Sequence, residues 1–441
     1  MPAVSILKRD GTATATYSTY EAARFASVSG DVIQIWADLT EQIILKNGVD
    51  IWIMPGVELN NTSGVTITDI ESSISHEIHC KIYGQGKIKN MGGYSCVFLD
   101  NINSELTMEC YSFDTSTGNS DTIKIIRARK FHLLCKSIIS KGTAINIAFN
   151  SQIVVEDINL KVNYIETGHS SGIVATSIVT YANGFININE ILCKNSGHCF
   201  RHSEGSIIAR IQRLTNIRAS SIAVSTVTVG QGDGLEKLIL YFDEIQALGS
   251  GSFLSYSGIT VGEGTGIFIG RKVFSMDSPA IEIGGASTKG YIKCNEIISQ
   301  GRGGIDSVSA VNLSNFTNQI TIDANYIQGY RSNGVVFIND ANVQIKNAKL
   351  VNTYTGTSVS SLGIFIAGTK VITLINVQIV IGELSNGRSI YHTGSTEPDT
   401  FDLKNYGLFV NKAIDSNLKL LIGTNLGTGY NYQYIIDPLL T

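Results

Sequence analysis

The sequence predicts an all-β fold, a parallel β-helix solenoid in which each coil contributes three short strands joined by three turns. The first observation is a repeated phrase in which apolar and polar residues alternate at period two, break, and resume after a Gly or Ala. It is clearest at 186–191 with 197–200 and at 291–297 with 303–305. The second observation is a spacing of 22 to 31 residues between the apolar residues that open the third strand of each coil: Val97, Ile123, Ile145, Ile173, Phe200, Ile222, Phe253, Ile281, Ile305, Val335, Ile364 and Ile390.

The same pattern argues against two other repeat architectures. Leucine-rich repeats have a similar length but need a Leu-rich phrase closed by Asn, and no such phrase recurs in the sequence. Helical repeats need apolar residues spaced by three and four. Because parallel crossovers are right-handed in nearly all proteins, we expect a right-handed solenoid.

Composition and charge restrict the possible partners. The chain of 441 residues has a charged fraction of 16%, well below the ~25% of a typical globular protein. Its net charge is −4 and its Lys and Arg residues are spread along the chain, so we expect no nucleic-acid partner. The sequence shows no signal-peptide pattern and no apolar run of membrane-spanning length, which predicts synthesis in a cytoplasm and no membrane insertion.

The seven cysteines predict buried free thiols. Their number is odd, none has the spacing C-x-x-C, and several occupy strand positions where an inward Val would serve, as Cys110 does in 106–110. We therefore expect no disulfide framework, no metal site and no cofactor.

The N-terminal region predicts an arm, a short helix and the first strands. Residues 1–17 are polar and rich in Thr and Ala, and we expect an arm without strands that docks to another protein. Ser18–Glu21 fits a capping box and predicts a helix over Ala22–Ala26 that ends at Gly30. Such a helix would cover the open end of the first coil. Strands are expected at Asp31–Trp36, Glu41–Leu45 and Val49–Ile53.

This opening resembles a known superfamily. The stretches Ser29–Ile35, Leu45–Ile53 and Pro55–Val57 are similar to the start of right-handed parallel β-helix proteins of the pectate-lyase type. That superfamily includes polysaccharide lyases, glycoside hydrolases and phage tailspikes, so the resemblance implies the fold and leaves the activity open. The coil rhythm covers residues 18–395, and we expect the apolar tail 396–441 to cap the last coil and to join copies of the chain.

The resemblance implies that catalytic groups are outward-facing side chains on neighbouring coils. Glycoside hydrolysis needs two carboxyl groups about 5 to 10 Å apart, which is one or two strand spacings of ~4.8 Å. In the row of residues that follow the strand-opening positions, Glu282 and Asp306 are successive, and Arg302 is nearby. We predict these three residues as the catalytic group, and the alternative is a solvated turn pair.

Two further groups are candidates for substrate binding. His198, Arg201 and His202 surround Phe200, and without a compact His/Cys spacing they predict a groove without metal. Sugar rings stack on aromatic faces, although tyrosines also finish the ends of packed strands. The tyrosines near strand ends and turns that we predict to bind substrate are Tyr256, Tyr291 and Tyr330.

The outward row also contains apolar residues, which predicts a covered surface. These are Val174, Ala223, Leu254, Val336 and Phe365. A second subunit or a long turn would cover them, and we expect a homotrimer about a threefold axis. A shift of register by one residue would turn the row inward and remove this argument.

Three functions remain as hypotheses. The first is a virion-associated, tailspike-like homotrimer that binds, or binds and cleaves, a bacterial surface polysaccharide and docks to a virion or tail protein through its N-terminal arm. The second is a free-standing polysaccharide lyase or glycoside hydrolase. The third is a purely structural particle component.

Overall fold

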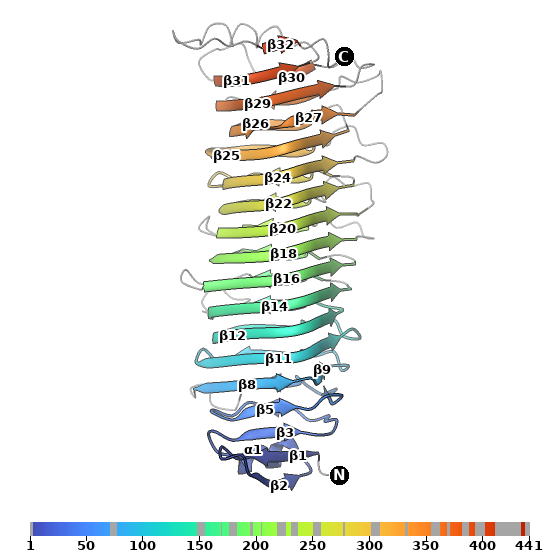
Figure 1. The fold of residues 1–441 in the computed structure, drawn as a ribbon, viewed down its shortest axis with the longest axis vertical. Coiled ribbons are helices and arrows are strands. Elements are labelled where there is room, and N and C mark those ends of the chain that lie inside the picture. The colour runs from blue at the N-terminus through green and yellow to red at the C-terminus, as the bar shows by residue number, and fades with distance from the viewer. Residues whose placement is uncertain are drawn as a thin grey trace. The chain divides into compact units, whose positions relative to one another are not determined.

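The chain forms a parallel β-solenoid of about 10 turns with almost no helix. The computed structural model describes residues 3–441 except 71–76, 148–154, 169, 176–182, 195–196, 204, 218–225, 231–236, 250–256, 277, 301–308, 331–333, 354–361, 368–370, 382–387, 393–401, 411–433 and 437–441. The chain divides into two units, Met1–Gln212 and Arg213–Thr441, and within each the strands stack coil upon coil (Figure 1). The predicted all-β parallel solenoid is confirmed.

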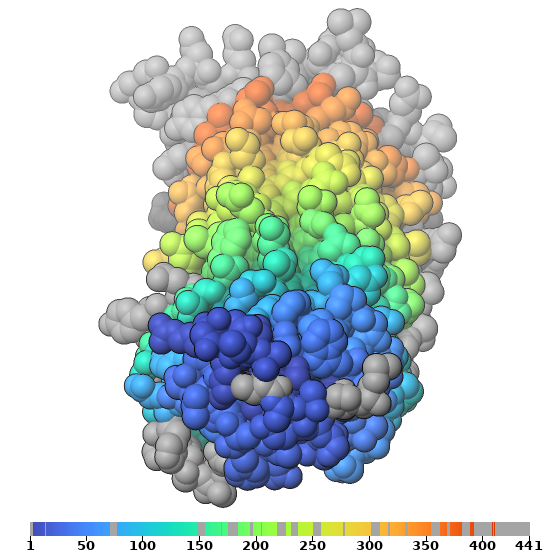
Figure 2. All heavy atoms as spheres, turned by 60° about the horizontal axis from the view of Figure 1, so that its bottom comes forward, coloured from blue at the N-terminus to red at the C-terminus, as the bar shows by residue number. Residues whose placement is uncertain are grey.

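The N-terminal segment is a β-hairpin, so the prediction of a strandless arm is wrong. β1 (Val4–Leu7) pairs antiparallel with both β2 (Ala13–Tyr17) and β3 (Val32–Ile35). Val4 and Ile6 are buried, because β1 has the apolar alternation that the neighbouring Thr- and Ala-rich stretch lacks. Figure 2 shows the first residues of the chain, in dark blue, at the surface of the N-terminal end.

The predicted helix forms, but with a different cap. α1 (Tyr20–Ala26) begins after the N-cap Thr19, whose side chain accepts a hydrogen bond from the N–H of Ala22 at 3.2 Å. The carboxylate that accepts from the N–H groups of Tyr20 and Glu21, at 2.6 and 3.2 Å, comes from Glu41 in the next coil. The capping box from Ser18 to Glu21 is therefore wrong, and the role of the helix as a lid stays a prediction.

Three ladders of parallel strands build the first unit, and each buries one column of apolar side chains. The column predicted from the sequence is confirmed, with fully buried, directly paired residues Val97, Ile123, Ile145, Ile173 and Phe200. A second buried column consists of Leu106, Phe131 and Ile158. A third consists of Leu59, Ile88, Phe113, Ile138, Ile165 and Ile191. The strands from β4 to β18 are β4 (Ile43–Ile44), β5 (Asp50–Ile53), β6 (Glu58–Asn60), β7 (Ile67–Thr68), β8 (Ile78–Gly84), β9 (Lys87–Lys89), β10 (Val97–Asp100), β11 (Ser104–Thr115), β12 (Ile123–Ser140), β13 (Ile145–Ile147), β14 (Val155–Thr167), β15 (Ile173–Ala175), β16 (Asn183–Cys193), β17 (Phe200–His202) and β18 (Ser206–Asn216).

The second unit follows the same plan with a register that differs from the predicted one. Its column of strand-opening residues is Val227, Ile259, Ile281, Val311, Val336, Ile364 and Ile390. Val336 replaces Val335 in this column and is fully buried, so its predicted outward position is wrong. Phe365 lies one position after its column and packs between Phe337 and Tyr391, with ring centroids 5.2 and 5.6 Å away. The remaining strands are β19 (Val227–Val229), β20 (Lys237–Ala247), β21 (Ile259–Val261), β22 (Thr265–Ser275), β23 (Ile281–Ile283), β24 (Lys289–Ser299), β25 (Val311–Gly329), β26 (Val336–Lys346), β27 (Lys349–Asn352), β28 (Leu362–Ala367), β29 (Val371–Ile381), β30 (Arg388–His392), β31 (Asp402–Val410) and β32 (Tyr434–Ile436).

The ladder continues past residue 395, where the sequence predicts the end of the β-helix. β31 pairs parallel with β29, and β32 pairs parallel with β31. Part of the apolar tail is therefore strand in the same ladder. Its role in joining copies of the chain stays a prediction.

All seven cysteines are free and buried, as the sequence predicts. Burial raises the pKa of the Cys110 and Cys294 thiols to about 12. None of the helices in the described part of the chain is long and apolar enough to cross a membrane.

Candidate functional site

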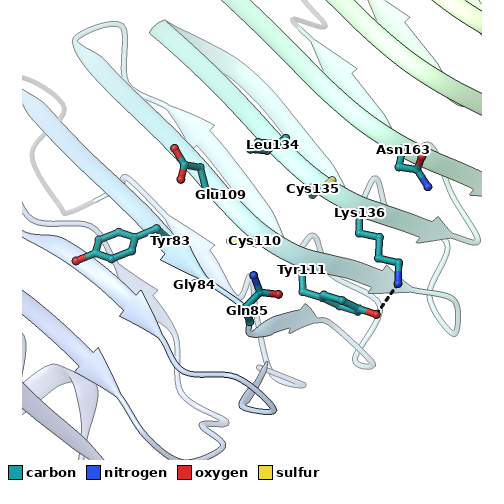
Figure 3. Close-up of a pocket in the computed structure, with 10 residues that line it drawn as sticks. All are labelled: Tyr83, Gly84, Gln85, Glu109, Cys110, Tyr111, Leu134, Cys135, Lys136 and Asn163. Carbon is teal, nitrogen blue, oxygen red and sulfur yellow. Dashed lines mark hydrogen bonds between the residues drawn. The ribbon is translucent and has the colours of Figure 1, made fainter.

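A groove of about 530 Å³ lies on the outer face of β8, β11, β12 and β14 in the first unit (Figure 3). This volume is within the ~300–1,000 Å³ range of ligand pockets. Residues from four successive coils line it, so it runs across the strands. Its polar and aromatic lining residues are Tyr83, Gln85, Glu109, Tyr111, Lys136 and Asn163.

Strand alternation places these side chains outward. Cys110 and Cys135 are direct neighbours in the ladder and point into the core. Glu109 and Leu134, one position earlier, are therefore also neighbours and face outward, where Leu134 is 45% exposed. Tyr111 and Lys136, one position after the two cysteines, contact each other.

Lys136 and Tyr111 form the main polar contact in the groove. The Lys136 Nζ donates to the Tyr111 hydroxyl at 2.9 Å, and the ammonium lies 4.9 Å from the centre of the Tyr111 ring. Figure 3 shows the two side chains extending along the same side of the groove. The hydrogen bond from Lys136 lowers the pKa of the Tyr111 phenol, because the ammonium favours the phenolate.

An aromatic and charged column adjoins the groove. Tyr83 stacks on Trp52 of β5, with ring centroids 5.9 Å apart and an angle of 21° between the rings. Lys81 forms an ion pair with Glu109 at 2.9 Å, and its ammonium lies 5.6 Å from the centre of the Tyr83 ring. The groove therefore combines two aromatic faces with charges of both signs.

Gly84 shapes the floor at one end of the groove. Its φ of 123° is in the region that favours glycine. A Cβ at this position would lie 2.0 Å from the carbonyl oxygen of Ile53. Glycine is therefore needed at this position, where the backbone passes close to β5 of the preceding coil.

The predicted catalytic group is not assembled in the described part of the chain. Glu282 is in β23, where its carboxylate accepts a hydrogen bond from the Ser257 hydroxyl at 3.0 Å. Its ladder neighbours are Thr260 and Asn312, so the rung predicted for Asp306 belongs to Asn312. Asp306 and Arg302 lie outside the described residues. The shift has a simple cause, because the turn between the two coils is longer than the pattern indicates.

The predicted histidine group is only partly at the surface. His202 is fully buried, and one ring nitrogen, Nε2, lies 3.0 Å from the Gly205 carbonyl oxygen, so the prediction that this residue lines a binding groove is wrong. Arg201 precedes it on the outward side of β17 and pairs with Val174 in the ladder. His198 is half-buried. A role for His198 or Arg201 in binding stays a prediction.

The predicted tyrosines belong to the second unit, whereas the residues that line the groove belong to the first. Tyr291 lies on β24, and its hydroxyl donates to the Asp323 carboxylate at 3.5 Å. Tyr330 is 38% exposed after β25, and Tyr256 lies outside the described residues.

Sequence reasoning missed the groove residues, although one signal was present. Cys110 and Cys135 occupy equivalent strand positions in successive coils, and aligning them places Tyr111 beside Lys136. In the sequence we considered pairs of acidic residues and groups of histidines, and a pair of one tyrosine and one lysine fits neither pattern. No group of three or more His, Cys, Asp or Glu able to hold a metal ion occurs among the residues that the structure describes.

Comparisons with known proteins give no relative. No family model, no curated protein and no solved structure matches the chain.

Proposed function

We propose that this protein binds a bacterial surface polysaccharide in the groove across β8, β11, β12 and β14. The observation that carries the proposal is the exposed pairing of Tyr111 with Lys136, beside Tyr83 and Glu109. Sugar rings present C–H faces that pack on aromatic rings, and their hydroxyl groups bond to charged and amide side chains. The groove offers both kinds of contact on one surface.

The direction of the groove suits an extended polymer. Its lining residues come from four neighbouring strands, and three spacings of ~4.8 Å give a length of about 14 Å. The Trp52 and Tyr83 stack continues the aromatic surface towards β5. A chain of several sugar units would therefore contact residues of more than one coil.

The groove supports binding better than hydrolysis. Glycoside hydrolysis uses two carboxyl groups, and Glu109 is the one carboxylate among the groove's described lining residues. Lys81 already pairs with it. Polysaccharide binding in this groove does not depend on three other predictions, which remain predictions. They are cleavage at Glu282, attachment to a virion and assembly as a trimer.

A panel of purified capsular and O-antigen polysaccharides, immobilised and probed with the full chain, tests the proposal. We expect at least one to bind and Tyr111→Ala to weaken that binding about tenfold, a loss of ~1.4 kcal/mol. The matched control is Tyr94→Ala, since Tyr94 is a 45% exposed tyrosine of the same unit outside the groove lining. Binding that is equal in the Tyr111→Ala variant, or absent across the panel, would contradict the proposal.

A further inference from the structure

Two of the buried cysteines meet across one turn of the first unit. Cys193 is the last residue of β16, and Cys199 directly precedes β17. The Cys193 thiol donates a hydrogen bond at 3.4 Å to the carbonyl oxygen of His198, the residue before Cys199. The Cys199 thiol lies 3.9 Å from the carbonyl oxygen of Ile191 and forms a hydrogen bond with the Cys193 sulfur. The two thiols therefore contact each other in the core, where both side chains are fully buried.

The ladder pairing of the coils explains why these two side chains meet. Cys193 belongs to a column of inward-facing residues on one side of the turn, and Cys199 belongs to a second column on the other side. The first column is Thr115, Ser140, Thr167 and Cys193, and the second is Thr122, Ala144, Gly172 and Cys199. The turns between the columns differ in length, but the strands on both sides hold each column in register. Equivalent pairs across the turn are therefore similarly placed in successive coils.

An equivalent pair in an earlier coil shows how closely the two columns approach. The hydroxyl oxygens of Thr115 and Thr122 are 2.5 Å apart, and both side chains are fully buried. Each oxygen is one bond from Cβ, which is the position that sulfur has in cysteine. A disulfide joins Cβ atoms about 3.5–4.5 Å apart, and side chains that touch through these atoms are compatible with that separation. The geometry of the turn thus permits a bond between Cys193 and Cys199.

The other pair of neighbouring cysteines is less suited to a disulfide. Cys110 and Cys135 are direct partners in the ladder of β11 and β12. Their side chains point the same way from parallel strands ~4.8 Å apart. Their Cβ atoms are therefore farther apart than the about 3.5–4.5 Å of a disulfide. We expect this pair to stay reduced.

The surroundings of Cys193 favour its thiolate. Burial alone would raise its pKa, but hydrogen bonds from the Cys199 thiol and from the Thr167 hydroxyl, the latter at 3.2 Å, lower the pKa of the Cys193 thiol. The thiolate is the form that attacks an oxidant. Burial instead raises the pKa of the thiols of Cys80, Cys96, Cys110, Cys135 and Cys294.

We propose that peroxide converts Cys193 and Cys199 into a reversible disulfide across the turn between β16 and β17. The Cys193 thiolate attacks one oxygen of hydrogen peroxide, the O–O bond breaks, and the leaving hydroxide takes up a proton and becomes water. The Cys199 sulfur then attacks the resulting sulfenic acid, and its proton leaves with the displaced hydroxide as a second water. Two thiols are oxidised and one peroxide is reduced. Because both thiols are buried, the turn must open transiently to admit the oxidant.

Peroxide treatment of the folded, full-length chain tests this proposal. We expect the treated chain to lose two of its seven thiols, counted after denaturation, and its mass to fall by that of two hydrogen atoms. Proteolysis without reduction should yield a peptide that joins Cys193 to Cys199, and dithiothreitol should restore both thiols. The oxidised chain should also unfold at a higher temperature than the reduced chain, because the bond restricts the unfolded state.

Two variants show whether the bond is specific. Cys193→Ser should form no disulfide under the same treatment, whereas Cys294→Ser, the matched control for loss of a buried thiol, should still form it. The peptide map of the parent chain gives a result even if either variant fails to fold. Seven thiols remaining in the treated parent, or a disulfide that joins Cys110 to Cys135 in place of this pair, would overturn the proposal.

Discussion

The Asp69 carboxyl predicts a pH-dependent stability for the first unit. Asp69 follows β7, is 2% exposed, and accepts hydrogen bonds from the N–H groups of Asp100 and Asn101, at 2.9 and 3.2 Å, and from the Ser104 hydroxyl at 2.7 Å. It holds the turn between β10 and β11. Burial outweighs these hydrogen bonds and raises the pKa of Asp69 from 3.8 to about 6.

The sign and size of the effect follow from this shift. Because the pKa is higher in the folded chain, the folded state retains a proton that the unfolded chain releases. The stabilisation is complete below pH 3.8 and is lost as the pH rises through about 6. At ~1.36 kcal/mol per pKa unit, the free energy of unfolding should fall by about 3 kcal/mol over this interval.

Urea unfolding of the chain and of Asp69→Asn between pH 4 and 7 measures the effect. The variant keeps a neutral side chain of the same shape, but its amide group cannot accept all three hydrogen bonds, so we expect an offset of about 1–2 kcal/mol that does not depend on pH. The unfolding free energy of the chain minus that of the variant should fall by about 2 kcal/mol as the pH rises from 4 to 6.5, so that the variant becomes the more stable of the two. Glu156→Gln, at an exposed position, controls for the loss of a charge. A difference that stays constant across this range would refute the reasoning.

Two other substitutions probe the core and the groove. Phe131→Ala removes a fully buried ring from the first unit and should lower the free energy of unfolding by ~3–5 kcal/mol, whereas Phe25→Ala, at a 68% exposed position, should change it by less than ~0.5 kcal/mol. Similar thermal unfolding of both variants would show that Phe131 is not part of a packed core. Lys136→Met removes the donor to the phenol and should raise the pKa of Tyr111, seen in alkaline ultraviolet titration as the difference from a Tyr111→Phe variant. An unchanged titration would show that the contact does not form in solution.

The local pattern predicts the fold class and much of the core. Alternation at period two assigns each residue to the inside or outside of its own strand, and this information is local in sequence. The column from Val97 to Phe200 and the seven buried cysteines are therefore predicted correctly. The N-terminal hairpin was missed because β2 lacks this alternation and depends on its pairing with β1.

The sequence by itself determined that this chain is a parallel β-solenoid, because strand alternation and coil length are properties of contiguous stretches. The tertiary structure decided which residues of successive coils are neighbours, since that depends on the length of each turn. The turn before β25 is longer than the sequence pattern predicts, so Asn312 and not Asp306 pairs with Glu282. A register shift of one residue places Val336 in the core. The same stacking brought Lys136 to Tyr111 and so created the groove. Neighbours across coils are far apart in sequence, and their contacts follow only once the register is fixed.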